Sequence, residues 1–236
     1  MQTIQSNLEH IHQQIKDSER KFGRLTDSVQ LLAVSKTKPI QAVLDACHAG
    51  QRQFGENYVQ EGVEKIQYFQ EHHNDFDIEW HFIGPIQSNK TRPISESFDW
   101  VHSIDRLKIA QRLNDQRPSG SDPLQVLLQV NTSGEESKSG INAAEALELA
   151  AAVDALPNLT LRGLMSIPAA VASYEEQLQA FNQLKGLFDQ IKSQYPQVDT
   201  LSMGMSGDME AAIEAGSTMV RIGTAIFGAR DYSNKQ

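Results

Sequence analysis

The sequence predicts an α/β protein, a single (β/α)8 TIM barrel preceded by one extra helix. Three observations support this prediction: eight short apolar runs, helical patterns between most of them, and a length of 236 residues. Strands that alternate with helices form right-handed βαβ units and a parallel sheet. Eight such units within residues 29–228 favour a closed barrel, and an open sheet with two wrongly assigned strands is the alternative.

The first element is an amphipathic pattern in residues 2–22. Ile4, Leu8, Ile11 and Ile15 recur there at helical spacing among polar residues. Because this pattern precedes the first apolar run, we expect it to form a helix outside the strand-and-helix repeat.

The predicted strands are short and rich in Val, Ile, Leu and aromatic residues. Several of them are apolar throughout, which is typical of strands that are buried on both faces of a parallel sheet. They cover residues 29–35, 52–56, 79–84, 99–104, 124–130, 159–167, 199–204 and 218–223.

The segments between the strands show the start and stop signals of helices. Residues 39–50 open with proline and close with glycine, and residues 142–156 begin with Asn142 as a candidate N-cap. The helix near residues 87–95 is short, and we expect Pro93 to interrupt it. The other predicted helices cover residues 58–70, 105–116, 174–194 and 208–216. Asp105 and Asp208 are the first residues of two of these helices and are candidate N-caps.

Composition and charge exclude several classes of protein. The formal net charge of −9 repels phosphate backbones, which argues against nucleic-acid binding. The single cysteine, Cys47, allows no internal disulfide framework and suits a reducing compartment. There is no secretory signal and no run of about 20 apolar residues. We expect a cytoplasmic protein of one domain, residues 1–236, divided into a helix (1–23), a barrel (29–228) and a tail (229–236).

Two basic residues follow neighbouring strands of the predicted barrel. Lys36 comes directly after the first strand, and Arg221 lies at the end of the last strand. The first and last strands of a closed barrel are neighbours, so both side chains should lie at the same rim. An amine in an apolar mouth can attack a carbonyl and form a Schiff base. A lysine that extends into solvent and an arginine paired with a carboxylate are the competing interpretations.

Two glycine-rich turns, residues 202–213 and 221–228, follow the seventh and eighth strands. Loops at these places hold phosphate in many TIM barrels, although ordinary turn chemistry also explains glycine there. An amine, a phosphate site and a cation together suit a phosphorylated aldehyde. Pyridoxal 5′-phosphate (PLP) is such a ligand, and the sugar phosphate of an aldolase is another.

Several motifs together identify a family resemblance. They include LLAVSKTKP (31–39), WHFIGPIQSNK (80–90), SMGMSGDMEAAI (202–213) and RIGTAIFG (221–228), and they are spread over nearly the whole chain. In these motifs the sequence closely resembles the pyridoxal phosphate homeostasis protein family. The fold of that family resembles the N-terminal barrel domain of alanine racemase.

The resemblance implies a PLP site with particular residues. Lys36 matches the lysine that forms the Schiff base with PLP, and Arg221 matches the arginine that faces the pyridine nitrogen. Asn57, His81 and Met165 lie in matching strand-end segments, so we expect them near the ring. The complete set of implied cofactor-binding residues is Lys36, Asn57, His81, Met165, Ser206, Gly207, Arg221, Gly223 and Thr224, of which Ser206, Gly223 and Thr224 match phosphate-holding positions.

The same resemblance limits the expected chemistry. An arginine at the ring nitrogen keeps that nitrogen unprotonated, which weakens the ring as an electron sink. Racemisation also needs acid and base groups on both faces of the substrate, and in the racemase a second subunit and a second domain complete the site. The barrel uses the whole of this chain, so we expect no complete racemase site.

The resulting expectation is a non-catalytic, monomeric PLP-binding protein that holds PLP as a Schiff base. It would maintain intracellular PLP, vitamin B6 and amino-acid homeostasis, with PLP-dependent apo-enzymes as candidate partners and no metal, nucleic acid or membrane. The alternatives are a weak PLP-dependent racemase or decarboxylase, and a Schiff-base aldolase. Whether Lys138 or Lys235 forms a second adduct is left open.

Overall fold

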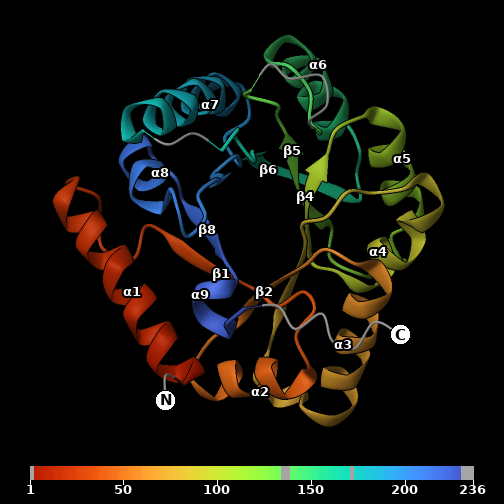
Figure 1. The fold of residues 1–236 in the computed structure, drawn as a ribbon. Coiled ribbons are helices and arrows are strands. Elements are labelled where there is room, and N and C mark those ends of the chain that lie inside the picture. Colours follow the sequence, from red (N-terminus) through yellow and green to blue (C-terminus); the bar gives the residue numbers. More distant parts are fainter. Residues whose placement is uncertain (1–2, 134–138, 171–172, 230–236) are drawn as a thin grey trace.

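Eight parallel strands form a closed barrel in which each strand pairs with its neighbours in sequence order, as Figure 1 shows. The computed structural model describes residues 3–133, 139–170 and 173–229. The predicted (β/α)8 barrel is therefore confirmed. The strands are β1 (Gln30–Val34), β2 (Gln53–Glu56), β3 (Glu79–Phe82), β4 (Trp100–Ile104), β5 (Leu124–Gln129), β6 (Leu159–Met165), β7 (Thr200–Ser202) and β8 (Met219–Ile222).

Helices surround the barrel and connect successive strands (Figure 1). None of the described helices is long and apolar enough to cross a bilayer. The helices are α1 (Ile4–Lys21), α2 (Ile40–His48), α3 (Val59–His72), α4 (Thr91–Ser97), α5 (Leu107–Gln116), α6 (Ala143–Asp154), α7 (Tyr174–Gln194), α8 (Met209–Ala215) and α9 (Thr224–Phe227), with short 3-10 turns η1 (Asn74–Phe76) and η2 (Ser88–Lys90).

The N-terminal helix α1 completes the outer ring of helices. It packs against α2, α8 and α9, and Figure 1 shows it between α8 and α2. Leu8, Ile11 and Ile15 form its buried face, as their spacing predicts. Asn7 Nδ2 donates to the backbone oxygen of Ile226 at 2.8 Å. Because α9 is only four residues long, α1 covers the side of β8 and β1 that a longer final helix would cover.

Two features of the predicted helices differ in the structure: the effect of Pro93 on α4 and the N-cap of α5. Pro93 lies in the first turn of α4, where its missing N–H removes no intrahelical bond, so it does not interrupt the helix. Helix α5 begins at Leu107 with Arg106 at the N-cap, so Asp105 is not the cap. Asn142, in contrast, forms the expected N-cap of α6 and accepts from Glu145 N in a capping box.

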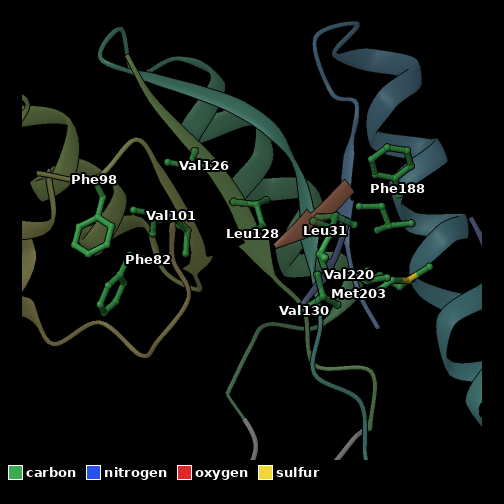
Figure 2. Close-up of a cluster of buried hydrophobic side chains, with 14 of the residues drawn as sticks. Leu31, Phe82, Phe98, Val101, Val126, Leu128, Val130, Phe188, Met203 and Val220 are labelled. Atoms are coloured by element: carbon green, nitrogen blue, oxygen red, sulfur yellow. The ribbon is translucent and has the colours of Figure 1, made fainter. Parts of the chain in front are cut away.

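Alternate residues of each strand belong to different apolar layers. Leu31 and Val220 belong to the large cluster between strands and helices, and Figure 2 shows them with Phe188 of α7. Their neighbours Leu32 and Met219 belong instead to a small separate cluster with Ile83. A second small cluster contains Trp100, Leu127 and Met165. The barrel interior is therefore packed mainly by these two small groups and by polar residues.

Candidate functional site

A cavity of about 340 Å³ opens at the C-terminal ends of the strands. Its lining includes Val34 at the end of β1, Ile83 just after β3 and Ile167 just after β6. Most of the predicted cofactor-binding residues line it: Lys36, Asn57, Ser206, Gly207, Arg221, Gly223 and Thr224.

His81 and Met165 do not line this cavity, although the resemblance places them near the ligand. Both side chains are fully buried, and Met165 packs against Trp100 and Leu127. Ile83 and Ile167, two positions further along the chain, line the cavity instead. Side chains two residues apart point to the same face of a strand. His81 and Met165 therefore lie one layer below the residues at the mouth.

A buried ionic cluster lies behind the loop that carries Lys36. Lys65 Nζ on α3 donates to Glu56 Oε1 at 2.8 Å and to Glu61 Oε1 at 2.7 Å. It also donates to the backbone oxygen of Ser35 at 2.7 Å. The side chains of Lys65 and Glu56 are 5% and 0% exposed. We call Lys65, Glu56 and Glu61 the loop clamp, because their contacts reach the chain beside Lys36.

The loop clamp holds both neighbours of Lys36. Ser35 Oγ donates to Glu56 Oε1 at 2.6 Å, and Thr37 N donates to Glu61 Oε1 at 2.6 Å. Thr37 has φ of 62°, a left-handed conformation that costs a β-branched residue about 1–3 kcal/mol. These hydrogen bonds hold that strained backbone and so fix the point from which the Lys36 side chain leaves the loop.

Asn57 lines the cavity from the loop after β2. A Cβ atom at Gly84 would lie 2.2 Å from the backbone oxygen of Asn57, so only glycine allows the two loops to approach so closely. Ser103 Oγ donates to the oxygen of Gly84 at 2.6 Å and holds the second loop. Asn57 Oδ1 is buried without a hydrogen-bond partner among the described residues. It is an acceptor that a ligand in the cavity can use.

Arg221 places a buried cation at the cavity. Arg221 is 5% exposed, and its guanidinium group donates to Ser202 Oγ at 2.7 Å and to the backbone oxygen of Ser166 at 2.9 Å. Burial lowers the pKa of Arg221 to about 10, and the charge of Asp208 opposes this shift. The side chain is still a cation at neutral pH. Strand β8 pairs with β1, so Arg221 and Lys36 lie at one rim, as predicted.

The two glycine-rich turns bring hydroxyl groups and small residues to the same mouth. Ser206 and Gly207 come from the turn before α8, and Gly223 and Thr224 follow β8 at the start of α9. In the first turn Met205 N donates to Asp208 Oδ1 at 2.6 Å, so Asp208 at the N-cap position holds the turn and makes no side-chain cap bond to α8. This group of hydroxyls and backbone suits an anion.

Sequence reasoning missed the residues that support the site from below. Lys65 interrupts the apolar face of the predicted helix 58–70, and His102 and Ser202 are polar residues inside strands. A polar residue at an inward strand position is a detectable signal. Its partner lies on a distant strand, however, and single-sequence patterns do not show which one.

The remaining sequence predictions concern residues away from the cavity. Cys47 is fully buried and burial raises its pKa to about 11, as suits a packing residue and not a nucleophile. In the described part of the chain, no group of three His, Cys, Asp or Glu side chains is placed to hold a metal ion. Lys138 and Lys235 lie outside the described residues.

The barrel and its site define a class of protein. The family described as "Alanine racemase, N-terminal domain" matches residues 6–231, which is nearly the whole chain. The closed eight-stranded barrel, with a lysine after β1 and an arginine at the end of β8, is thus a barrel of the alanine racemase N-terminal type.

Within that class the chain belongs to the pyridoxal phosphate homeostasis protein family. It is 69% identical over 233 residues to the pyridoxal phosphate homeostasis protein of Vibrio alginolyticus, covering 99% of this chain and 100% of the relative. It is 60% identical over 235 residues to the protein of that name from Escherichia coli K12, covering 100% of both chains.

Solved structures show the same fold. PipY of Synechococcus elongatus, solved with PLP bound, is 35% identical with a TM-score of 0.77, covering 91% of this chain and 100% of that one. A protein of Bifidobacterium adolescentis is 35% identical with a TM-score of 0.89, covering 95% and 94%. Alanine racemase of Clostridium difficile shares the fold at 15% identity with a TM-score of 0.76, covering 96% of this chain and 56% of the racemase.

Proposed function

We propose that this protein holds PLP in the cavity at the C-terminal end of the barrel and maintains PLP, vitamin B6 and amino-acid homeostasis. The observation that supports this most strongly is the placement of Lys36 and Arg221 in one cavity with two hydroxyl-bearing turns. The printed names of the relatives, and the PLP bound to PipY at 35% identity, support the same ligand.

The residues of the cavity fit PLP in size and in chemistry. A volume of about 340 Å³ lies within the range of small-molecule sites. Lys36 offers an amine, Arg221 a buried cation, and Ser206 and Thr224 hydroxyl groups. Asn57 Oδ1, which has no partner within the described part of the chain, is the kind of buried polar atom expected where a polar ligand completes the hydrogen bonds.

Each of these residues has a distinct task in the proposed complex. PLP supplies an aldehyde that condenses with an amine, forming a C=N bond and releasing one water molecule. Lys36 provides that amine, and water or another amine can reverse the link. Ser206 and Thr224, with the backbone at Gly207 and Gly223, hold the phosphate. Arg221, which can only donate, would face the pyridine nitrogen and would keep it unprotonated.

A holding role fits the lining better than a full catalytic role. Among the described residues that line the cavity there is no His, Asp, Glu, Tyr or Cys. Apart from lysine, the lining thus offers few groups for general acid–base work on an amino acid. We propose a monomeric cytoplasmic protein that releases PLP to PLP-dependent apo-enzymes.

Borohydride trapping tests the proposed link. The protein incubated with PLP should turn yellow, and reduction should fix a pyridoxyl group on Lys36 that peptide mass spectrometry locates. Lys36→Ala should lose this adduct and keep its fold. Lys38→Ala is the matched control, because Lys38 lines the same cavity and should not be needed for the adduct. The same adduct mass at another lysine of Lys36→Ala would show that the wrong lysine is assigned.

Two further measurements separate holding from catalysis. Alanine incubated with the loaded protein in D2O should show no α-deuteration beyond the stoichiometric amount, and sustained turnover would contradict the holding role. Loaded protein should activate a PLP-dependent apo-enzyme. The comparison with an equal amount of free PLP shows whether the protein delivers its ligand directly.

A further inference from the structure

A chain of hydrogen bonds crosses the barrel interior below the cavity. Arg221 Nη1 donates to Ser202 Oγ at 2.7 Å, and Ser202 Oγ lies 3.0 Å from His102 Nδ1. His102 Nε2 lies 2.8 Å from His81 Nδ1, and His81 Nε2 lies 2.8 Å from Glu79 Oε1. We call these five residues the interior chain. It connects β8, β7, β4 and β3 through the centre of the barrel.

The interior chain joins the two opposite mouths of the barrel. Arg221 lines the cavity at the C-terminal ends of the strands. Glu79, at the start of β3, lines a second cavity of about 440 Å³ together with residues near the starts of β4 and β5. The Glu79 side chain is 39% exposed, whereas His81, His102 and Ser202 are 0% exposed. Apolar side chains usually fill this part of a TIM barrel, so a polar chain here requires each buried member to be paired.

Donor and acceptor chemistry fixes the direction of every bond in the interior chain. An ionised Glu79 can only accept, so the neutral ring of His81 carries its proton on Nε2 and leaves Nδ1 as an acceptor. His102 must then donate from Nε2 and accept at Nδ1. His102 Nδ1 therefore accepts a hydrogen bond from the Ser202 hydroxyl group. Arg221, which has only donors, donates to the Ser202 oxygen, which is compatible with this arrangement, so the direction of the chain is set at the Glu79 end.

The electrostatics of the interior favour the neutral rings that this arrangement needs. Burial lowers the pKa of His81, although the Glu79 carboxylate opposes that shift. The pKa of His102 is well below its usual value because of burial, with His81 and Arg221 acting in the same direction. Trp100 stacks on His81 at a centroid distance of 5.2 Å and an interplanar angle of 12°, which holds the ring in place.

We propose that Glu79 is a positioning residue for Arg221, acting through His81, His102 and Ser202 from the far mouth of the barrel. Glu79 sets the tautomer of both histidines. The Ser202 hydroxyl proton then points to His102, so His102 does not compete with Arg221 as a donor to the Ser202 oxygen, and the bond from Arg221 Nη1 orients the guanidinium at the cavity. This inference rests on the proposed function only where it names PLP as the ligand that Arg221 contacts. The histidine tautomers and the position of Arg221 are properties of the protein without PLP.

Nitrogen-15 NMR of the histidine rings in PLP-free protein at pH 7.5 tests the tautomers. In the wild type both His81 and His102 should be neutral with the proton on Nε2. Glu79→Lys replaces an acceptor by a donor, so both rings should change to the Nδ1-protonated form. Glu79→Gln is the matched control, since its amide oxygen can still accept, and both rings should keep the wild-type form. A His102 ring that is unchanged in Glu79→Lys overturns the proposal.

The guanidinium signals of Arg221 in the same PLP-free samples test the positioning. Wild type and Glu79→Gln should show restricted rotation with resolved Nη signals, and Glu79→Lys should lose them. Ser202→Ala is a second variant in case Glu79→Lys does not fold. It should remove the bond of Arg221 Nη1 and leave only the bond of Nη2 to the backbone oxygen of Ser166, yet keep the histidine tautomers unchanged, because Glu79 still sets them. Resolved Nη signals in Glu79→Lys overturn the positioning role of Glu79, and, where that variant does not fold, resolved Nη1 signals in Ser202→Ala overturn it.

Titration with PLP then connects the interior chain to the site. The Kd for PLP should rise roughly two- to tenfold in Glu79→Lys and Ser202→Ala, the effect of about one hydrogen bond, and should stay near wild type in Glu79→Gln. Equal Kd values in all four proteins would overturn the inference. A wild type that binds no PLP but shows the expected tautomers and Arg221 signals would contradict the proposed function alone.

Discussion

Gly163 lies on β6 at a position where any side chain would collide with the neighbouring strand β7. It has φ of 153°, and a Cβ atom there would lie 1.8 Å from the backbone oxygen of Thr200 on β7. The pairing of β5 with β6 also shifts register next to it. At this position the chain therefore needs both the conformational freedom of glycine and its lack of a side chain.

Gly163→Ala should lower the free energy of unfolding by about 2–6 kcal/mol, since backbone strain and overpacking add. Urea unfolding followed by circular dichroism measures it. The matched control is Gly186→Ala on α7, where a Cβ atom meets nothing within 4 Å. That change should stabilise the protein by about 0.5–1 kcal/mol. Equal effects of the two substitutions would refute this explanation.

The loop clamp gives a second prediction at the residue scale. Lys65→Met should cost about 3–5 kcal/mol of unfolding free energy, because it leaves the fully buried Glu56 carboxylate unpaired. Adding Glu56→Gln should recover part of that loss, and a double-mutant cycle of urea unfolding measures the recovery. Lys108→Met, at an exposed lysine of α5, is the control and should be near neutral. Strictly additive losses would show that the two residues do not interact.

The positions of some site residues could be predicted from the sequence, and the positions of others could not. Lys36 and Arg221 could be placed together because closure of the barrel makes β1 and β8 neighbours. Whether His81 faces the barrel interior or the outer helices could not be decided from the sequence, and the structure places it in the interior, as it does Met165. The tilt and stagger of the strands decide which of two inward-facing residues reaches the cavity. These two quantities cannot be predicted from the pattern of a single sequence.

At the scale of elements, α1 depends on its apolar stripe for its attachment to the barrel. Its first turn is closed by a capping box between Thr3 and Ser6. Arg24, just beyond its end, donates to the backbone oxygens of Ile213 and Ser217 at 2.8 and 2.9 Å. The helix is therefore capped at its start, held to the barrel by Arg24 just beyond its end, and packed against the barrel along its length.

Ile11→Ala should lower the free energy of unfolding by about 2–5 kcal/mol, because Ile11 is 4% exposed and its loss leaves a cavity under α1. Thermal and urea unfolding measure this change. Lys16→Ala, at an exposed position of the same helix, should stay within about 0.5 kcal/mol of wild type. A comparable loss in Lys16→Ala would point to helix propensity and not to packing as the cause.

Element types were predictable from apolar periodicity, whereas several boundaries were not. All eight strands lie within the predicted apolar runs, because strands that are buried on both faces are rich in apolar residues. Helix α5 starts two residues after Asp105 although aspartate is a good cap. Helix α5 packs against α4 and β4, and tertiary contacts of this kind can override the local preference of aspartate for the N-cap position.

At the scale of the whole molecule, two neutral histidines make stability depend on pH. His81 and His102 are fully buried, and the pKa of each is lower in the fold than its ordinary value of about 6.5. Below that pH the unfolded chain binds protons that the folded protein does not bind. The free energy of unfolding therefore falls as pH drops, by up to about 1.4 kcal/mol per pH unit for each histidine, until the folded-state pKa is reached.

Urea unfolding at pH 7.5, 6.5 and 5.5 should show this loss, with little change between pH 7.5 and 8.5. His102→Gln should make the dependence below pH 6.5 shallower, whatever its effect on absolute stability. His10→Gln, at an exposed position of α1, should leave the slope as it is. If the unfolding free energy of His102→Gln falls with pH as steeply as that of the wild type, groups other than His102 cause the pH dependence.

The bond between Asn7 and Ile226 joins positions 219 apart in the sequence, and β1 pairs with β8 over a similar span. During synthesis, therefore, β1 and α1 leave the ribosome long before the strand and turn that complete them. Until β8 emerges, β1 is an unpaired edge and the apolar stripe of α1 is only partly covered. Such long-range closure is slow. The growing chain thus spends its most aggregation-prone period with the barrel open at the seam where Lys36 and Arg221 later meet.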